Sequence, residues 1–483
     1  MSKNHPDNCV QNRSICGPQE TCNEITEVCE PNGGGPGGSL AIDDIQPRRV
    51  PSSSQQGQKR EITITGRGFL PSATVHLYER EERIDATVVS STQIVATVPQ
   101  SSDVCQPVRV RVNNPDGQFA TRSDLFGYSI AKPSFFMENF PLNLVGADGL
   151  SHPPFLAIAD LDNDGGLDVV TAFSAGGRSA VVVIPRIGHG MPPRYFLGQA
   201  TFTALAVGQL GYGPSPEIVV AYTQGTTGGV FIFRDGQLSS PLSLPTSHPV
   251  TGLALADMNR DGRLDLVLST GSGSTSVLQV YQNQGNGLSK IAMDDVSIDS
   301  CPAPSLAAAD LDGDGAPDVA LACPNGLVVA RNDGAGGLSM NTLRWGSSAF
   351  SSLAAADFNG DGRMDLALAD NTSISIVRFE AGGLVEKAHE TVSSTASPIR
   401  IEAADINCDL WPDVVYTKSG TDLGVVLNQG KEGWQLTTLV EGMGSGTPRI
   451  AVGDFNNDRR PDVLTSYLAE SSSPLFRFWN SGS

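Results

Sequence analysis

The chain has 483 residues, and its 52 acidic and 32 basic side chains give a formal net charge of −20. Such an acidic chain is unsuited to nucleic acid, because binding to a duplex needs Lys and Arg to displace counterions. No run of 18 apolar residues is present, so we expect no transmembrane segment.

The first segment, residues 1–31, is rich in cysteine and poor in apolar residues. It holds four cysteines: Cys9, Cys16, Cys22 and Cys29. Their spacing is wider than that of zinc ligands and favours two disulfides, whose pairing stays open among three alternatives. The cysteines are typical of a secreted protein, although residues 1–31 lack the apolar stretch of a secretory signal. We therefore expect a secreted or cell-surface protein whose targeting segment is missing from this chain. Residues 32–39, rich in Gly and Pro, predict a flexible linker.

Residues 40–131 form a second unit with the period-two alternation of β-strands. The clearest strands are expected at 62–65, 74–78, 93–98 and 108–112. Short strands at this spacing, separated by turn residues, predict an immunoglobulin-like β-sandwich.

The rest of the chain, residues 132–483, repeats a nine-residue loop in which side-chain oxygens fill places 1, 3, 5 and 9. Numbered by repeat, the intact loops are loop 1 (Asp160, Asp162, Asp164, Asp168), loop 3 (Asp257, Asn259, Asp261, Asp265), loop 4 (Asp310, Asp312, Asp314, Asp318), loop 5 (Asp357, Asn359, Asp361, Asp365), loop 6 (Asp405, Asn407, Asp409, Asp413) and loop 7 (Asp454, Asn456, Asp458, Asp462). Loop 2, residues 209–217, keeps a carboxylate only at place 9, as Glu217, and we expect it to bind no metal.

The loops have the composition of calcium sites. Ca²⁺ takes six to eight oxygen ligands, and the EF-hand loop begins with the same 1, 3, 5 spacing and a Gly at place 6. Gly occupies place 6 in loops 1, 3, 4 and 5, whereas Leu410 and Arg459 stand there in loops 6 and 7. The six loops hold 20 aspartates, as many as the net charge, so we expect about six bound Ca²⁺. The alternative is that the acidic residues only keep the protein soluble.

The spacing of the loops predicts the architecture. Place 1 recurs after 49, 48, 53, 47, 48 and 49 residues, with only strand-like segments between. A period near 50 residues predicts an all-β protein with a seven-bladed β-propeller of four-stranded blades. Residues 134–145 are expected to supply the missing fourth strand of the last blade and close the ring.

The strand before each loop alternates small and large residues, as strands crowded around an axis do. Glu402 breaks this pattern, since Ala occupies the equivalent position in the other repeats. Its carboxylate either reaches water at the mouth of the central channel or belongs to a polar site inside it.

Residues 132–483 resemble the FG-GAP or VCBS repeats of integrin α-chain propellers. Residues 40–131 resemble IPT/TIG domains through Ile45-Gln-Pro47, Ile64-Thr-Gly-Arg-Gly-Phe69 and Asn113-Asn-Pro-Asp-Gly117. The first resemblance implies a calcium-stiffened propeller that binds a protein or a glycan. The second implies a spacer of the kind found in cell-surface proteins.

Four further cysteines lie outside the N-terminal segment. Cys301 and Cys323 flank one predicted hairpin, so a disulfide between them is expected, with two buried thiols as the alternative. Cys105 lies in the predicted sandwich and Cys408 in loop 6, and the sequence explains neither.

No catalytic constellation is found, because the six His residues are scattered and none stands near a nucleophile motif. We therefore expect a monomeric, non-enzymatic adhesion or ligand-binding protein whose partner is a surface protein or a glycan. The alternative is a carbohydrate-directed propeller, either a lectin or a polysaccharide-cleaving enzyme. Tyr195, Trp345 and Trp434 are the aromatic candidates for a sugar site, but packing against neighbouring blades explains them equally well.

Overall fold

The computed structural model divides the chain into two compact units. The first comprises Met1–Ser134, Asn407–Leu410 and Ser481–Ser483, and the second comprises Phe135–Ile406 and Trp411–Asn480. The structure describes residues 20–23, 28–31, 40–52, 60–77, 82–101, 104–130, 133–140, 154–175, 177–186, 193–211, 213–234, 238–272, 275–285, 287–290, 296–299, 301, 305–339, 343–345, 349–379, 386–393, 398–418, 423–440, 445–468 and 475–482. The disulfides expected among Cys9, Cys16, Cys22 and Cys29 depend on side chains outside the described residues.

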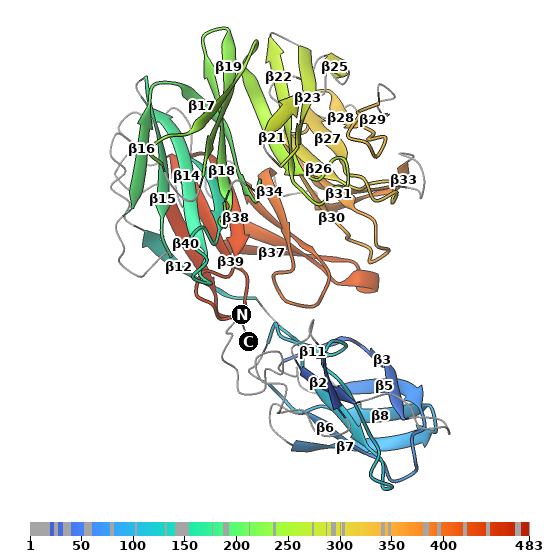
Figure 1. The fold of residues 1–483 in the computed structure, drawn as a ribbon. Coiled ribbons are helices and arrows are strands. Elements are labelled where there is room, and N and C mark those ends of the chain that lie inside the picture. The colour runs from blue at the N-terminus through green and yellow to red at the C-terminus, as the bar shows by residue number, and fades with distance from the viewer. Residues whose placement is uncertain are drawn as a thin grey trace. The chain divides into compact units, whose positions relative to one another are not determined.

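Among its described residues, the first unit contains eleven strands, several of them labelled in Figure 1. They are β1 (Glu20–Asn23), β2 (Val28–Pro31), β3 (Ala41–Gln46), β4 (Arg49–Pro51), β5 (Glu61–Arg67), β6 (Thr74–Leu77), β7 (Glu82–Ser90), β8 (Gln93–Thr97), β9 (Val110–Asn113), β10 (Phe119–Arg122) and β11 (Gly127–Ser129). The principal sheet has the order β10-β9-β6-β7-β8-β5-β3, and β7 joins its two halves by pairing first with β6 and then with β8. Alternate residues such as Ile62, Ile64 and Ile94 fill the core between these halves, and the predicted immunoglobulin-like unit is confirmed.

Cys105 and Cys408 form a disulfide within the first unit. The backbone N–H of Ile130 also donates to the carbonyl of Asn407 at 2.6 Å, and Cys408 packs against the apolar core of this unit. These contacts account for both cysteines that the sequence left unexplained.

The second unit consists of seven four-stranded blades, which confirms the predicted propeller (Figure 1). The first strands of blades 1 to 7 are β13 (Phe155–Ala159), β17 (Thr201–Gly208), β21 (Val250–Ala256), β26 (Ser305–Ala309), β30 (Ser352–Ala356), β34 (Pro398–Ala404) and β38 (Ser445–Gly453). The second strands are β14 (Asp168–Ala175), β18 (Glu217–Gln224), β22 (Asp265–Ser272), β27 (Asp318–Cys323), β31 (Asp365–Ala369), β35 (Asp413–Lys418) and β39 (Asp462–Leu468). Each second strand therefore begins with the place-9 residue of its loop.

The outer half of each blade completes this pattern. The third strands are β15 (Arg178–Ile184), β19 (Thr227–Phe233), β23 (Thr275–Asn283), β28 (Gly326–Ala330), β32 (Ile374–Phe379), β36 (Leu423–Asn428) and β40 (Leu475–Asn480). The fourth strands are β16 (Arg194–Gly198), β20 (Leu242–Thr246), β24 (Leu288–Lys290), β29 (Leu343–Trp345), β33 (Glu386–Ser393), β37 (Trp434–Val440) and, for blade 7, β12 (Phe135–Phe140). Blade 3 has an additional strand, β25 (Val296–Asp299), paired with β23, and the 3-10 turn η2 (Gly430–Glu432) precedes β37.

The ring is closed by β12, the first propeller strand in the chain, which pairs antiparallel with β40, the last. Glu138 on β12 pairs with Arg477 on β40 and accepts a hydrogen bond from Trp479 Nε1 at 2.9 Å. Because β12 covers the outer edge of β40, the last blade presents no unpaired edge there.

Apolar residues from neighbouring blades form the cores between them. The core between blades 7 and 1, for example, joins Val169 and Ile184 with Leu464 and Leu475. Cys301 and Cys323 form the expected disulfide in the core between blades 3 and 4.

Four buried asparagines act as clasps, each joining its own blade to the one before it. They end the third strands of blades 3, 6 and 7 or lie two residues after that of blade 4: Asn283, Asn428, Asn480 and Asn332. Each side-chain amide donates to the place-2 carbonyl of the preceding blade, at 2.7 to 2.9 Å. Each backbone N–H also donates to the place-9 carboxylate of its own blade.

Replacing one clasp residue should therefore weaken a junction between blades. In Asn332→Ala the carbonyls of Met258 and Pro317 lose their 2.7 Å and 3.0 Å bonds from the side-chain amide. Leaving buried acceptors unsatisfied should destabilise the propeller by about 2–3 kcal/mol in chemical denaturation. Asn371→Ala, on an exposed turn, is the matched control and should change the stability by less than about 0.5 kcal/mol. Equal effects of the two substitutions would contradict the clasp.

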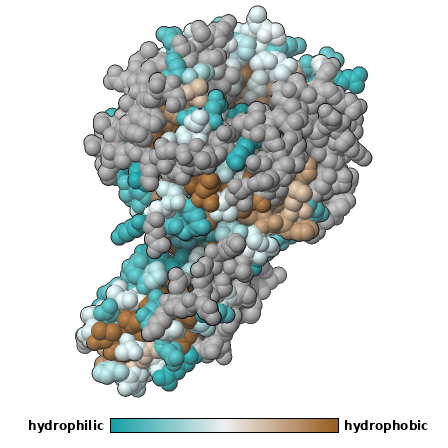
Figure 2. Space-filling view, turned by 180° about the vertical axis from the view of Figure 1, so that it is seen from behind, coloured by the Kyte–Doolittle hydropathy of each residue, from teal (hydrophilic) through white to brown (hydrophobic). Residues whose placement is uncertain are grey.

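Among the described residues, no helix is long and apolar enough to cross a membrane. On the face shown in Figure 2, the hydrophobic colour of the described residues gathers in small patches between hydrophilic atoms.

Candidate metal centres

The six intact loops share one backbone conformation. Place 4 has a positive φ of 58–77° in every loop, and so does place 6, at 71–86°. This left-handed geometry turns the chain sharply, so that places 1, 3 and 5 fall on the inside of the loop. Leu410 and Arg459 adopt it with φ of 76° and 71° although neither is Gly. Loops 6 and 7 therefore keep the turn that their sequences put in doubt.

A non-Gly residue in this region is strained, which gives a simple test in loop 7. Arg459→Gly should stabilise the protein by roughly 0.5–1 kcal/mol, because relief of the left-handed strain exceeds the entropy that Gly adds to the unfolded chain. Arg460→Gly is the control, because φ at this adjacent position is not positive, and it should destabilise slightly. Denaturant titration of both variants checks the difference in sign.

Hydrogen bonds inside each loop hold the ligand oxygens in position. In loop 5 the N–H of Asp361 donates to Asp357 at 3.1 Å and to Asn359 at 2.9 Å. The N–H of Gly362 donates to the second oxygen of Asp357 at 2.8 Å. Loops 1, 3 and 7 repeat this arrangement. The backbone therefore orders the side chains at places 1 and 3 before any ion binds.

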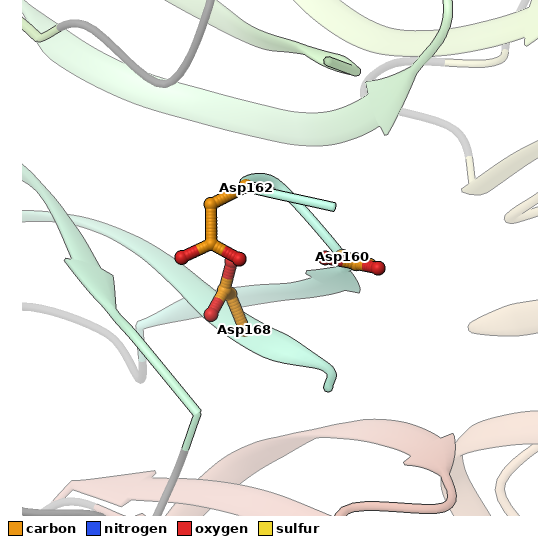
Figure 3. Close-up of side chains that lie close together, drawn as sticks. All are labelled: Asp160, Asp162 and Asp168. Atoms are coloured by element: carbon orange, nitrogen blue, oxygen red, sulfur yellow. The ribbon is translucent and has the colours of Figure 1, made fainter. Parts of the chain in front are cut away.

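Three carboxylates converge most closely in loops 1 and 4, the two loops with Asp at place 3. In loop 1, oxygens of Asp160, Asp162 and Asp168 lie within 4.8 Å of one another. In loop 4, the same holds for oxygens of Asp310, Asp312 and Asp314. Figure 3 shows Asp162 next to Asp168, with Asp160 beside them at the end of β13. In loops 3, 6 and 7 the place-3 Asn instead donates its amide to the place-5 carboxylate at 2.9–3.1 Å.

The environment of Asp312 fits a cation. Its Oδ2 is buried and accepts no hydrogen bond of normal geometry from the described residues, although Arg331 Nη2 lies 2.6 Å away. Arginines also approach the place-5 carboxylates of loops 3 and 5, where Arg263 and Arg363 lie 2.5 Å from Asp261 and Asp361. Sequence analysis missed these arginines, which partly neutralise the loops.

The place-9 residues have a structural role that the sequence analysis did not foresee. Asp265, for example, accepts the N–H of Met258 on one oxygen at 2.9 Å and that of Asn283 on the other at 2.7 Å. Equivalent pairs of bonds occur in blades 1, 4, 6 and 7. Place 9 thus ties the start of its loop to the end of the third strand.

These place-9 carboxylates are deeply buried beside other carboxylates. Burial is the largest cause that raises the pKa of Asp318, Asp365 and Asp462 to about 7. The negative charges of neighbouring aspartates act in the same direction. Such a shift is the expected consequence of burying a carboxylate beside other carboxylates.

Loop 2 retains the structural role of the place-9 carboxylate. Glu217 is fully buried and accepts the N–H of Leu210 at 2.6 Å. The remaining places carry no carboxylate, so the structural role explains why an acid persists at place 9 alone. That loop 2 binds no metal stays a prediction.

The other candidates for a binding site are separate from one another. Trp434 packs against Phe358 of the adjacent blade, with 5.9 Å between ring centroids, as expected for a packing residue. Tyr195 lies on β16 and is 37% exposed, and the side chain of Trp345 lies outside the described residues. Glu402 lines a cavity inside the propeller.

Comparison with family models identifies the repeats and the sandwich. Residues 310–368, 357–416 and 405–465 match the FG-GAP-like repeat, and residues 40–128 match the IPT/TIG domain. No curated protein matches the chain.

Several solved structures are similar to the chain at low sequence identity. An Agrocybe aegerita lectin that recognises non-reducing terminal N-acetylglucosamine is 16% identical, over 69% of this chain and 88% of that chain, with a TM-score of 0.42. An auxiliary nutrient binding protein from Bacteroides thetaiotaomicron is 8% identical, over 78% and 94%, with a TM-score of 0.35. The AfRom2 CNH domain is 10% identical, over 72% and 100%, with a TM-score of 0.46. These scores are too low to bear on function.

Proposed function

Because the chain carries FG-GAP-like repeats within a seven-bladed β-propeller, together with an IPT/TIG domain, we propose that it is a calcium-stabilised extracellular binding protein. Its propeller engages a surface protein or a glycan without catalysing a reaction. The observation that carries the proposal is the recurrence of one loop conformation and one set of oxygen ligands in six blades. Two disulfides among the described residues support an oxidising, extracellular location.

Calcium would be held by the side-chain oxygens at places 1, 3, 5 and 9 of the six intact loops. Bound there, the ion supplies positive charge that offsets the repulsion between clustered carboxylates. Loops 1 and 4 should bind most tightly, because each has a fourth carboxylate where the other loops have an amide. The residues themselves order the loop and join it to the second and third strands.

In this proposal the loops stiffen the propeller, and the surface or the central channel of the propeller binds the ligand. A rigid ring of blades is well suited to present residues from several blades at once, because a binding site then keeps its geometry before the ligand arrives. The same rigidity serves a protein partner and a glycan.

The test combines metal analysis with a search for the ligand. Elemental analysis after dialysis into calcium should give about six Ca²⁺ per chain, and fewer than one would overturn the calcium proposal. Calcium-loaded protein is then applied to a glycan array and to surface extracts, each repeated in chelator. Selective, chelator-sensitive glycan binding would favour the carbohydrate-directed alternative and make exposed Tyr195 the first aromatic to replace. Capture of a discrete protein would favour adhesion.

A further inference from the structure

A cavity of about 420 Å³ lies where the N-terminal ends of the seven first strands meet. All seven blades contribute residues to its lining. The acidic loops follow the C-terminal ends of the same strands, so the cavity is separate from the candidate calcium sites.

The residues that line this cavity break the seven-fold repeat on one side. Five residues before place 1, blades 2 to 5 have Ala, Gly or Ser, whereas blades 6, 7 and 1 have Arg400, Arg449 and Phe155. Three residues before place 1, Ala occurs in every blade except blade 6, which has Glu402. The four large or charged departures thus gather on three adjacent blades. A packed core gains nothing from two arginines at these positions, since Ala, Gly and Ser serve in the other four blades.

The two guanidinium groups both belong to the cavity lining and influence each other electrostatically. Arg449 stacks on the ring of Phe155, 4.4 Å from its centroid, and its buried Nε finds no hydrogen-bond acceptor in the described part of the chain. Arg400 donates to the carbonyl of Ser351. Burial, and then the charge of Arg400, lowers the pKa of Arg449 to about 9, and burial also lowers the pKa of Arg400. A guanidinium group is so strong a base that both remain positive at neutral pH.

Glu402 does not neutralise this pair. Its side chain is exposed to the cavity, but surrounding protein limits its hydration, and this desolvation raises its pKa to about 7. Near neutral pH the cavity therefore holds two positive charges and, at most, part of one negative charge.

We propose that this cavity binds the carboxylate of a small hydroxylated ligand, a sugar acid, between the guanidinium groups of Arg449 and Arg400. Guanidinium groups form strong charge-assisted bonds to a carboxylate, and two of them in a poorly hydrated cavity strengthen this preference. The volume is sufficient for a monosaccharide-sized molecule. This proposal makes the cavity the ligand site of the propeller, and it therefore rests on the binding role proposed above.

The rest of the lining suits hydroxyl groups. Thr203, Thr251 and Ser305 place hydroxyl-bearing residues on the lining from three consecutive blades. Glu402 offers a further acceptor, or a donor when protonated. These groups lie on the lining with the arginines, so a ligand with a carboxylate at one end and hydroxyls along its length matches the cavity.

Calorimetric titration of the full, calcium-loaded chain tests the proposal with two matched probe pairs. D-gluconate is compared with D-glucitol and D-glucuronate with D-glucose, since each pair differs mainly in the carboxylate. At pH 6 we expect at least one sugar acid to bind and both neutral sugars to bind at least tenfold more weakly. Arg449→Gln should weaken sugar-acid binding at least tenfold, whereas Arg178→Gln, an equal change of charge at an exposed position on β15, should leave it unchanged.

Absence of binding by both sugar acids would overturn the proposal, as would equal binding of the neutral probes or full affinity in Arg449→Gln. Melting curves in calcium and in chelator are recorded for each variant. A chain that responds to calcium but binds no sugar acid refutes the cavity site alone, whereas loss of the calcium response refutes the stabilisation by calcium.

Glu402 provides a second, independent readout. The charged groups on the cavity lining are Arg400, Glu402 and Arg449, and both arginines stay protonated between pH 6 and 8. As pH rises through about 7, Glu402 ionises and repels the bound carboxylate. Affinity should therefore fall about tenfold from pH 6 to pH 8, because the protonated fraction of Glu402 falls about tenfold over this range and charge repulsion disfavours binding to the ionised form. Glu402→Gln should bind well and abolish this fall, and a fall that persists in this variant would exclude the role of Glu402.

Discussion

Removing calcium with a chelator should lower the melting temperature of the full chain by roughly 20 °C. At a calcium concentration 100 times Kd, each site contributes about 2.7 kcal/mol, so six sites contribute roughly 15 kcal/mol if the propeller unfolds as one unit. Dividing by an unfolding entropy of about 2.1 cal/mol/K per residue for the propeller gives a shift of this size. Repulsion between the emptied carboxylates acts in the same direction. Scanning calorimetry in calcium and in chelator measures the shift.

Two controls make this result specific. Adding calcium in excess over the chelator should restore the original melt. Asp160→Asn, which removes one carboxylate from loop 1, should reduce the chelator-induced shift by about a sixth, since one site of six is weakened. A melt that moves by less than about 2 °C in chelator would contradict the assignment of all six loops as calcium sites.

Most of the propeller could be predicted because its repeats are local. The nine-residue loop, the strand that follows it and the small residues before it recur within each period of about 50 residues, so the period alone gives seven blades. In the sandwich, strand β7 was not predicted, because the charged residues Glu82 and Arg83 obscure the alternation at its start. Strands with few alternating residues leave a weak signal.

The asparagine clasps and the cavity could not be predicted because they depend on contacts between blades. Asn283, Asn332, Asn428 and Asn480 do recur near the ends of four third strands, but 14 to 18 residues after place 9, and this varying distance hides the repeat. Glu402 was noticed as an exception, but only the fold brings Arg449 and Phe155 from neighbouring blades to the same cavity. Likewise, the spacing of the loop residues predicts that place 9 is a calcium ligand, and the structure adds its role as an acceptor for two backbone N–H groups.

These two roles can be separated in blade 3, where place 1 is Asp257 and place 9 is Asp265. Asp265→Ala removes the acceptors for the N–H groups of Met258 and Asn283 and leaves both buried, in addition to removing a proposed calcium ligand. Loss of two charge-assisted bonds should cost about 4 kcal/mol even in chelator, which lowers the melting temperature by roughly 5 °C. The oxygens of Asp257 instead accept N–H groups of the exposed residues Asp261 and Gly262, for which water can substitute.

Asp257→Ala should therefore destabilise the chain clearly in calcium and by less than about 1 kcal/mol in chelator. Melting of both variants under both conditions separates the roles. If place 9 acted only as a calcium ligand, the two substitutions would become equivalent once the ion is removed. A large gap that persists in chelator would instead mean that the place-9 carboxylate joins loop to blade by itself. That role can be retained after a loop loses its other ligands, and it would explain Glu217 in blade 2, where the remaining ligand places are empty of carboxylates.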